Sequence, residues 1–130
     1  MALATAEARA DGLNPRTSSK DAHAWREFQA YARIRGFDPN LQSSWARSFP
    51  QREALKLSGF ILWRAQTMQP RSRRDAVAKP MSAYHSYLAL RRVFRKKDVD
   101  LPPSASVRET LRGLIRRFVR KFGIEQLRPK

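Results

Sequence analysis

The chain has 130 residues, of which 27 are Lys or Arg and 11 are Asp or Glu, so its formal net charge is +16. Twenty of the cationic residues are arginine, whose planar side chain matches phosphate groups and guanine edges. Hydrophobic residues make up 42% of the chain, which is enough for a folded core and excludes wholesale disorder. The composition therefore predicts one basic globular domain with an anionic partner.

Several classes of site and location are disfavoured by what the sequence lacks. Cysteine is absent, which excludes disulfides, thiolate metal sites and cysteine nucleophiles, and two histidines are too few for a zinc site. We therefore expect no metal, no cofactor and no small-molecule substrate. The longest apolar run, residues 60–63, is too short for a bilayer, and residues 1–12 lack the apolar core of a signal peptide. The expected location is cytoplasmic, without a membrane partner.

Residues 1–16 are predicted to be a flexible or short-helical lead. A first helix is expected from about Ser18 to Gly36, with Ser18 to Asp21 as a capping box. Its inner face would carry Ala24, Trp25, Phe28 and Ala32, and its outer face Ser19, His23, Arg26, Ala30 and Arg33.

A turn at residues 37–40 and a short helical segment at 41–47 should lead to a second helix, capped by Ser48 with Pro50 in its first turn. At helical spacing, the inner face of this helix would consist of Ala54, Leu55, Ser58, Ile61, Leu62 and Ala65. Phe60 and Trp63 fall elsewhere, so this nearly all-apolar helix is either central to its own bundle or docks a partner protein through these two rings.

Residues 69–80 contain two prolines and three arginines (Arg71, Arg73 and Arg74), which predict a basic loop. A third helix, capped by Ser82, should follow and end near Asp98. Its core stripe is predicted to be Ala83, Tyr87, Leu90 and Phe94, and its reverse side Ser82, His85, Ala89, Arg92 and Lys96.

A fourth helix is expected to open with a capping box at Ser106 to Glu109 and to run to about Lys121. Its predicted core side is Val107, Leu111, Leu114, Ile115, Phe118 and Phe122, and Arg108, Arg112, Arg116 and Arg120 recur every fourth position outside. Residues 124–130 should be a linker or tail. No strand pattern competes, so we predict an all-α domain over 17–123, a compact bundle of four to five helices.

Neutralising phosphates is the function that the charge indicates most directly. Because the aromatic residues fall mostly on core stripes, duplex DNA is favoured over RNA, and an RNA-binding or ribosome-associated protein is the alternative. Ser82, His85, Lys20 and His23 are candidates for reading base edges. The plainer interpretation is that Ser82 only caps its helix and that the histidines only face water.

Catalysis is not indicated. His23 to Arg26 spells H-x-x-R, a string found in some DNA-cleaving sites, and Tyr84 or Tyr87 could be imagined as a nucleophile. Trp25 and Tyr87 belong to core stripes, however, so we interpret the string as chance and predict no catalytic residue.

Three segments of the sequence occur in the same order as similar segments in a known protein family. The first segment is Asn14 to Thr17 together with the aromatic stretch AWREFQAYARIRG at residues 24–36. The second segment is residues 82–95, with the sequence SAYHSYLALRRVFR. The third segment is residues 101–117, with the sequence LPPSASVRETLRGLIRR. Together they resemble the N-terminal core-binding (SAM-like) domain of the tyrosine recombinase or phage integrase family. The resemblance covers about residues 14–123.

The resemblance implies a helical bundle over one side of duplex DNA, which it positions for DNA integration or recombination. By position, the DNA side would include Thr17, Ser19, Lys20, His23 and Arg26, then Ser82 and His85, with Arg112 and Arg116 on the backbone. The outer faces predicted above add Arg92, Lys96 and Arg108 to these candidates.

The basic loop at 69–80 and Asp98, in place of a helix-ending glycine, depart from the family pattern. The family's catalytic Arg, His, Arg and Tyr belong to a C-terminal domain that these 130 residues do not contain. The resemblance therefore implies binding without cutting, at the nucleoid, with a catalytic recombinase domain or other protomers as further partners.

Overall fold

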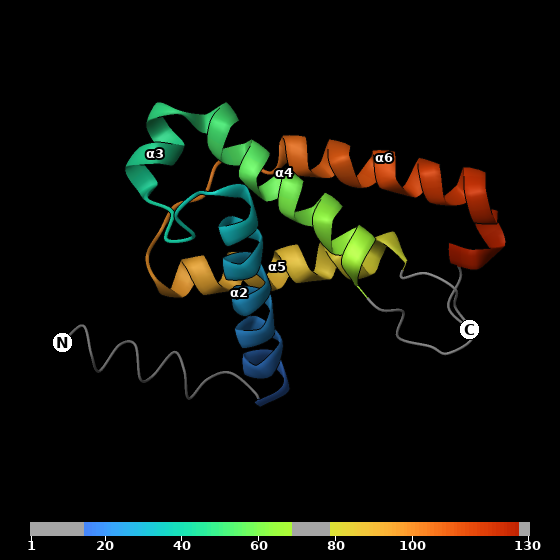
Figure 1. The fold of residues 1–130 in the computed structure, drawn as a ribbon, viewed down its shortest axis with the longest axis horizontal. Coiled ribbons are helices and arrows are strands. Elements are labelled where there is room, and N and C mark those ends of the chain that lie inside the picture. The colour runs from blue at the N-terminus through green and yellow to red at the C-terminus, as the bar shows by residue number, and fades with distance from the viewer. Residues whose placement is uncertain (1–14, 69–78, 128–130) are drawn as a thin grey trace.

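A computed structural model describes residues 15–68 and 79–127. Within them the chain folds into five α-helices, followed by one 3-10 turn (Figure 1). The elements are α2 (Pro15–Arg35), α3 (Ser43–Ser48), α4 (Pro50–Thr67), α5 (Pro80–Lys96), α6 (Ala105–Phe122) and η1 (Ile124–Leu127). The described residues contain no strand, which confirms the all-α prediction. None of these helices combines the length and the apolar character needed to cross a bilayer.

The helices form a bundle in which α4 and α5 are the central pair. α2 crosses α5 and also touches α4, while α6 packs against α4 and α5 and is followed by η1 (Figure 1). The short α3 leads directly into α4. α2 and α6 are therefore held by different parts of the same central pair.

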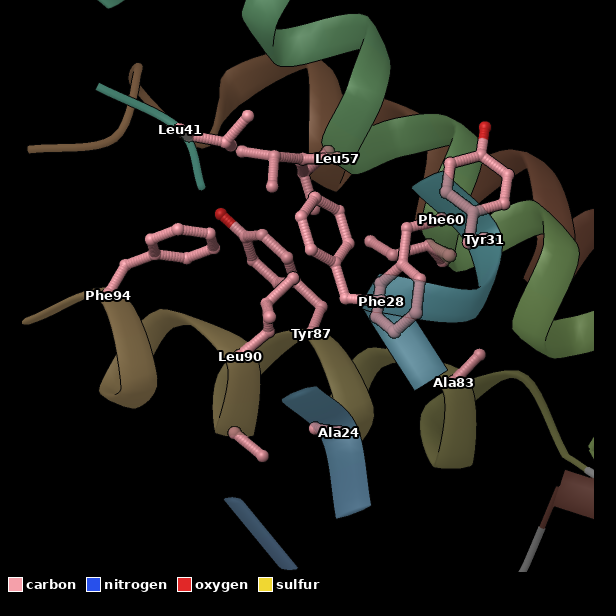
Figure 2. Packing of buried hydrophobic residues seen from close by; sticks show 13 residues of the cluster. Ala24, Phe28, Tyr31, Leu41, Leu57, Phe60, Ala83, Tyr87, Leu90 and Phe94 are labelled. Atoms are coloured by element: carbon pink, nitrogen blue, oxygen red, sulfur yellow. The ribbon is translucent and has the colours of Figure 1, made fainter. Parts of the chain in front are cut away.

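The core is built around aromatic rings that pack against one another. The Phe28 ring lies 5.3 Å from that of Phe60 and 5.8 Å from that of Phe94, both in edge-on geometry, which suits the charge distribution of aromatic faces and edges. Figure 2 shows Phe94 and Tyr87 rising from α5 toward Leu41 and Leu57. The predicted core residues that are buried are Ala24, Phe28, Ala32, Ala54, Ser58, Ile61, Ala83, Tyr87, Leu90, Phe94, Val107 and Phe118.

The predicted inner face of α4 is partly wrong. Leu55 is 69% exposed and Leu62 is also exposed, whereas Phe60 is completely buried and Trp63 is half-buried against Tyr31. The sequence of a helix that is apolar nearly all round does not indicate which of its faces will be buried. In this protein, packing against the aromatic rings of α2 determines which face of α4 is buried. Because Phe60 is inaccessible, the hypothesis that it docks a partner is wrong, whereas Trp63 is half-buried and its part of the hypothesis stays a prediction.

Prolines rather than hydroxyl caps mark three of the helix starts. Pro15, Pro50 and Pro80 are the first residues of α2, α4 and α5, where the missing N–H costs nothing and the fixed φ suits a helix. The predicted starts or caps at Ser18, Ser48 and Ser82 are therefore wrong, and the residues before α4 and α5 are Phe49 and Lys79.

The two ends of α6 also correct the sequence prediction. The residue before α6 is Ser104, and the hydroxyl of Ser106 lies inside the helix with no hydrogen-bond partner in the described part of the chain, so the capping box does not form. The helix ends at Phe122 before Gly123, as expected, but residues 124–127 form a turn rather than a plain tail. Asp98 follows α5 in the left-handed conformation, with φ of 57°, where glycine is commoner.

Parts of the predicted organisation lie outside the described residues. These are residues 1–14 of the lead, the basic loop with Arg71, Arg73 and Arg74, and residues 128–130.

Candidate nucleic-acid interface

A groove of about 980 Å³ lies between α2, the last turns of α4 and the part of α5 from Ser82 to Arg92. The sequence places the lining side chains of α2 and α5 far apart, and the crossing of the two helices brings them together. Seven of the predicted DNA-binding residues line this one groove, namely Ser19, Lys20, His23, Arg26, Ser82, His85 and Arg92.

The groove is positively charged. Lys20, Arg26, Arg64 and Arg92 line it, against the single carboxylate of Glu27. Lys20 and Arg26 are exposed, so their charges are available to a partner at the surface. Walls of low dielectric strengthen such a field, which attracts an anion and repels a cation.

Asp21 holds the α5 wall of the groove against α2. This carboxylate is buried, and its Oδ1 accepts from Arg92 at 2.9 Å while its Oδ2 lies 3.3 Å from the Lys96 ammonium. The prediction that Asp21 belongs to a capping box is therefore wrong. Its spacing to Ala24 and Phe28 places it on the buried stripe of α2, a signal that could have indicated a partner on another helix.

A second ion pair joins α2 to α4 at the groove. Arg64 is almost fully buried, and its Nη1 donates to Glu27 Oε2 at 3.3 Å, whereas its Nε has no hydrogen-bond partner among the described residues. Burial lowers the pKa of the Arg64 guanidinium, and the nearby Glu27 charge acts against that shift. Sequence reasoning missed this pair because Arg64 lies in the most apolar helix of the chain.

Ser82 and His85 lie on the α5 side of the groove. Ser82 is the third residue of α5 rather than the residue before the helix, and its carbonyl accepts from the Ser86 hydroxyl one turn later. The plainer interpretation of Ser82 as a cap is therefore wrong. His23 and His85 are both exposed and line the groove from its two opposing helices.

Five predicted residues lie elsewhere or are not described. The side chain of Thr17 lies outside the described residues. Lys96 reaches Asp21 but does not line the groove. The exposed arginines of α6 also lie outside it, namely Arg108, Arg112 and Arg116.

The described residues hold no group of three or more His, Asp or Glu side chains placed to share a metal ion. Tyr87 is completely buried, and the centre of its ring lies 5.9 Å from the centre of the Tyr84 ring, in a tilted arrangement. His23 and Arg26 line the groove, while Trp25 between them packs edge-on against Phe94 in the core.

Comparison with models of protein families, with curated proteins and with solved structures finds no match to this chain.

Proposed function

We propose that the groove between α2 and α5 binds duplex DNA, as in the core-binding domain of a tyrosine recombinase. Arginine and lysine side chains along its walls neutralise phosphates, which supplies affinity without sequence information. The protein positions DNA for a recombination or integration step and does not cut it, and in the cell it associates with the nucleoid.

One observation carries the proposal. Side chains singled out on two separate helices, from polarity and position alone, converge on a single cationic groove. The short polar groups among them, Ser19 and Ser82 with His23 and His85, line the same groove as the cations Lys20 and Arg26. Short donors and acceptors beside phosphate-binding cations are the combination that reads base edges in a groove of DNA.

The test is duplex binding measured by fluorescence anisotropy between 50 and 200 mM salt. An interface with about 6 to 10 phosphate contacts loses about 10³ to 10⁵-fold in affinity over this range, because bound counterions are released on association. The double variant Lys20→Gln with Arg26→Gln removes two contacts, so the slope of log affinity against log salt should fall by about 1.8.

The matched control is Arg47→Gln with Arg52→Gln, which changes the net charge equally. Both residues are exposed, and they lie in α3 and the first turn of α4, whereas the groove includes only the last turns of α4. Arg52 pairs with the buried Glu53, which keeps Lys56 as its partner in the control. We expect this control to weaken binding much less than the groove variant. Equal losses in both variants, or tighter binding of structured RNA at matched salt, would refute duplex binding by the groove.

A further inference from the structure

The outer face of α6 is a second concentration of positive charge. Arg108, Arg112, Arg116 and Arg120 repeat every fourth position and all are exposed. Within the described residues none of these four forms an ion pair. In the groove, by contrast, Arg92 and Arg64 are each paired with a carboxylate. The row on α6 therefore has the larger share of uncompensated charge.

This row lies on a different side of the molecule from the groove. Arg91 donates to the Ser104 hydroxyl at 2.6 Å and so holds the start of α6 against α5. Arg91 follows the groove residue Ser82 by nine positions, about two and a half helical turns, and so projects from the side of α5 opposite to Ser82. No residue of α6 lines the groove. In Figure 1, α6 runs along one edge of the bundle while the N-terminal half of α2 extends to the other.

We infer that the outer face of α6 binds the backbone of a second DNA duplex, so that one molecule holds two duplexes on opposite sides. The thirteen residues from Arg108 to Arg120 span about 18 Å, which matches about five phosphate-to-phosphate steps of one strand. The choice of DNA among polyanions follows the function proposed above.

The apolar face of α6 offers no fully exposed side chain to a different kind of partner. On that face Val107 and Phe118 are buried, Leu111, Leu114, Ile115 and Phe122 are half-buried, and no large apolar side chain of α6 is exposed. A membrane surface or a docking protein needs apolar anchors, and single-stranded RNA needs exposed rings for stacking. Guanidinium groups without such anchors fit a phosphate backbone.

The test counts duplexes bound per protein, by sedimentation of the complex with short duplexes in excess. The wild-type protein should bind two duplexes, and Arg112→Gln with Arg116→Gln should bind one, through the groove. Lys20→Gln with Arg26→Gln should also bind one, through α6. The control Arg47→Gln with Arg52→Gln should still bind two.

The outcomes separate the two proposals. If the wild-type protein binds one duplex and loses it only in the groove variant, the groove stands and the second surface is overturned. If it binds one duplex and loses it only in the α6 variant, α6 binds DNA but the two-duplex inference and the groove both fail. Binding of anionic vesicles or structured RNA that depends on Arg112 and Arg116, with no second duplex, also overturns the inference.

A gain of affinity provides an independent check. Glu109 is the only carboxylate of α6 and is exposed on the same helix as the arginine row. Glu109→Gln should tighten binding of the second duplex and leave the first unchanged. Unchanged or weaker binding of the second duplex would contradict the assignment of α6.

Discussion

Asp21 is the residue on which the geometry of the groove depends most. It is buried at the crossing of α2 and α5, and its two oxygens hold Arg92 and Lys96, whose side chains are 36% and 37% exposed. Because both cations remain partly hydrated, the pair contributes less than a fully buried one would. The carboxylate therefore orients the groove cation Arg92 and the neighbouring Lys96, and at the same time cancels part of the charge that would attract DNA.

Replacing Asp21 should separate these two effects. Asp21→Asn should lower the free energy of unfolding by about 1–2 kcal/mol, because the buried group loses its charge-assisted hydrogen bonds. It should also tighten DNA binding, since Arg92 and Lys96 lose their counter-charge. Urea unfolding and anisotropy titration measure the two changes.

The control for this prediction is Asp100→Asn, which makes the same change in net charge at an exposed residue whose side chain forms no described ion pair. It should leave stability nearly unchanged. A loss of both stability and affinity in Asp21→Asn would mean that orientation of the cations outweighs the freed charge.

At the scale of the elements, the close contact of α2 with α4 depends on one glycine. A Cβ at Gly59 would collide with the ring and hydroxyl of Tyr31. That ring is buried among Phe37, Phe60 and Trp63, so it has little room to move. Gly59 thus allows α2 and α4 to meet where the rotation of α4 is decided.

Two glycine variants should therefore move stability in opposite directions. Gly59→Ala should destabilise the protein by about 1–3 kcal/mol through overpacking, despite the better helix propensity of alanine. Gly113→Ala, in the middle of α6 with open space at its Cβ, should stabilise it by up to about 1 kcal/mol. Urea unfolding followed by circular dichroism measures both. If Gly59→Ala stabilises the protein, the Tyr31 ring can move away from the added methyl group at little cost.

For the whole molecule, the dominant fact is a net charge of +16 on a small domain. Three carboxylates, Asp21, Glu27 and Glu53, are already engaged in internal ion pairs. The 11 carboxylates of the chain are outnumbered by its 27 Lys and Arg side chains, so most of the positive charge has no counter-charge within the protein. The folded state therefore carries self-repulsion that is released when a polyanion binds.

This repulsion predicts opposite effects of salt on folding and on binding. Raising salt from 20 to 200 mM should raise the Tm of the free protein by a few degrees, because screening weakens repulsion between like charges. The same change should weaken DNA binding. Thermal unfolding followed by circular dichroism, with and without duplex DNA, measures both effects. A falling Tm of the free protein would show that its ion pairs outweigh the repulsion.

Local patterns in the sequence determined the helical class, the positions of the main helices and most of the core. Phe28, Tyr87 and Phe94 fell on predicted stripes because helical periodicity is a property of each segment alone. The excess of arginine, and with it the expectation of an anionic partner, needed no structure. The cap predictions failed because the prolines, not the nearby serines, set the starts of three helices.

Only the tertiary structure decided which faces meet. The rotation of α4, the partner of Asp21 and the burial of Arg64 all depend on side chains far away in sequence, and no local pattern encodes such contacts. The same packing joins α2 and α5 in one groove and directs the arginines of α6 elsewhere. Periodicity gives each helix its faces, but the packing of apolar surface and the pairing of buried charges orient those faces toward one another.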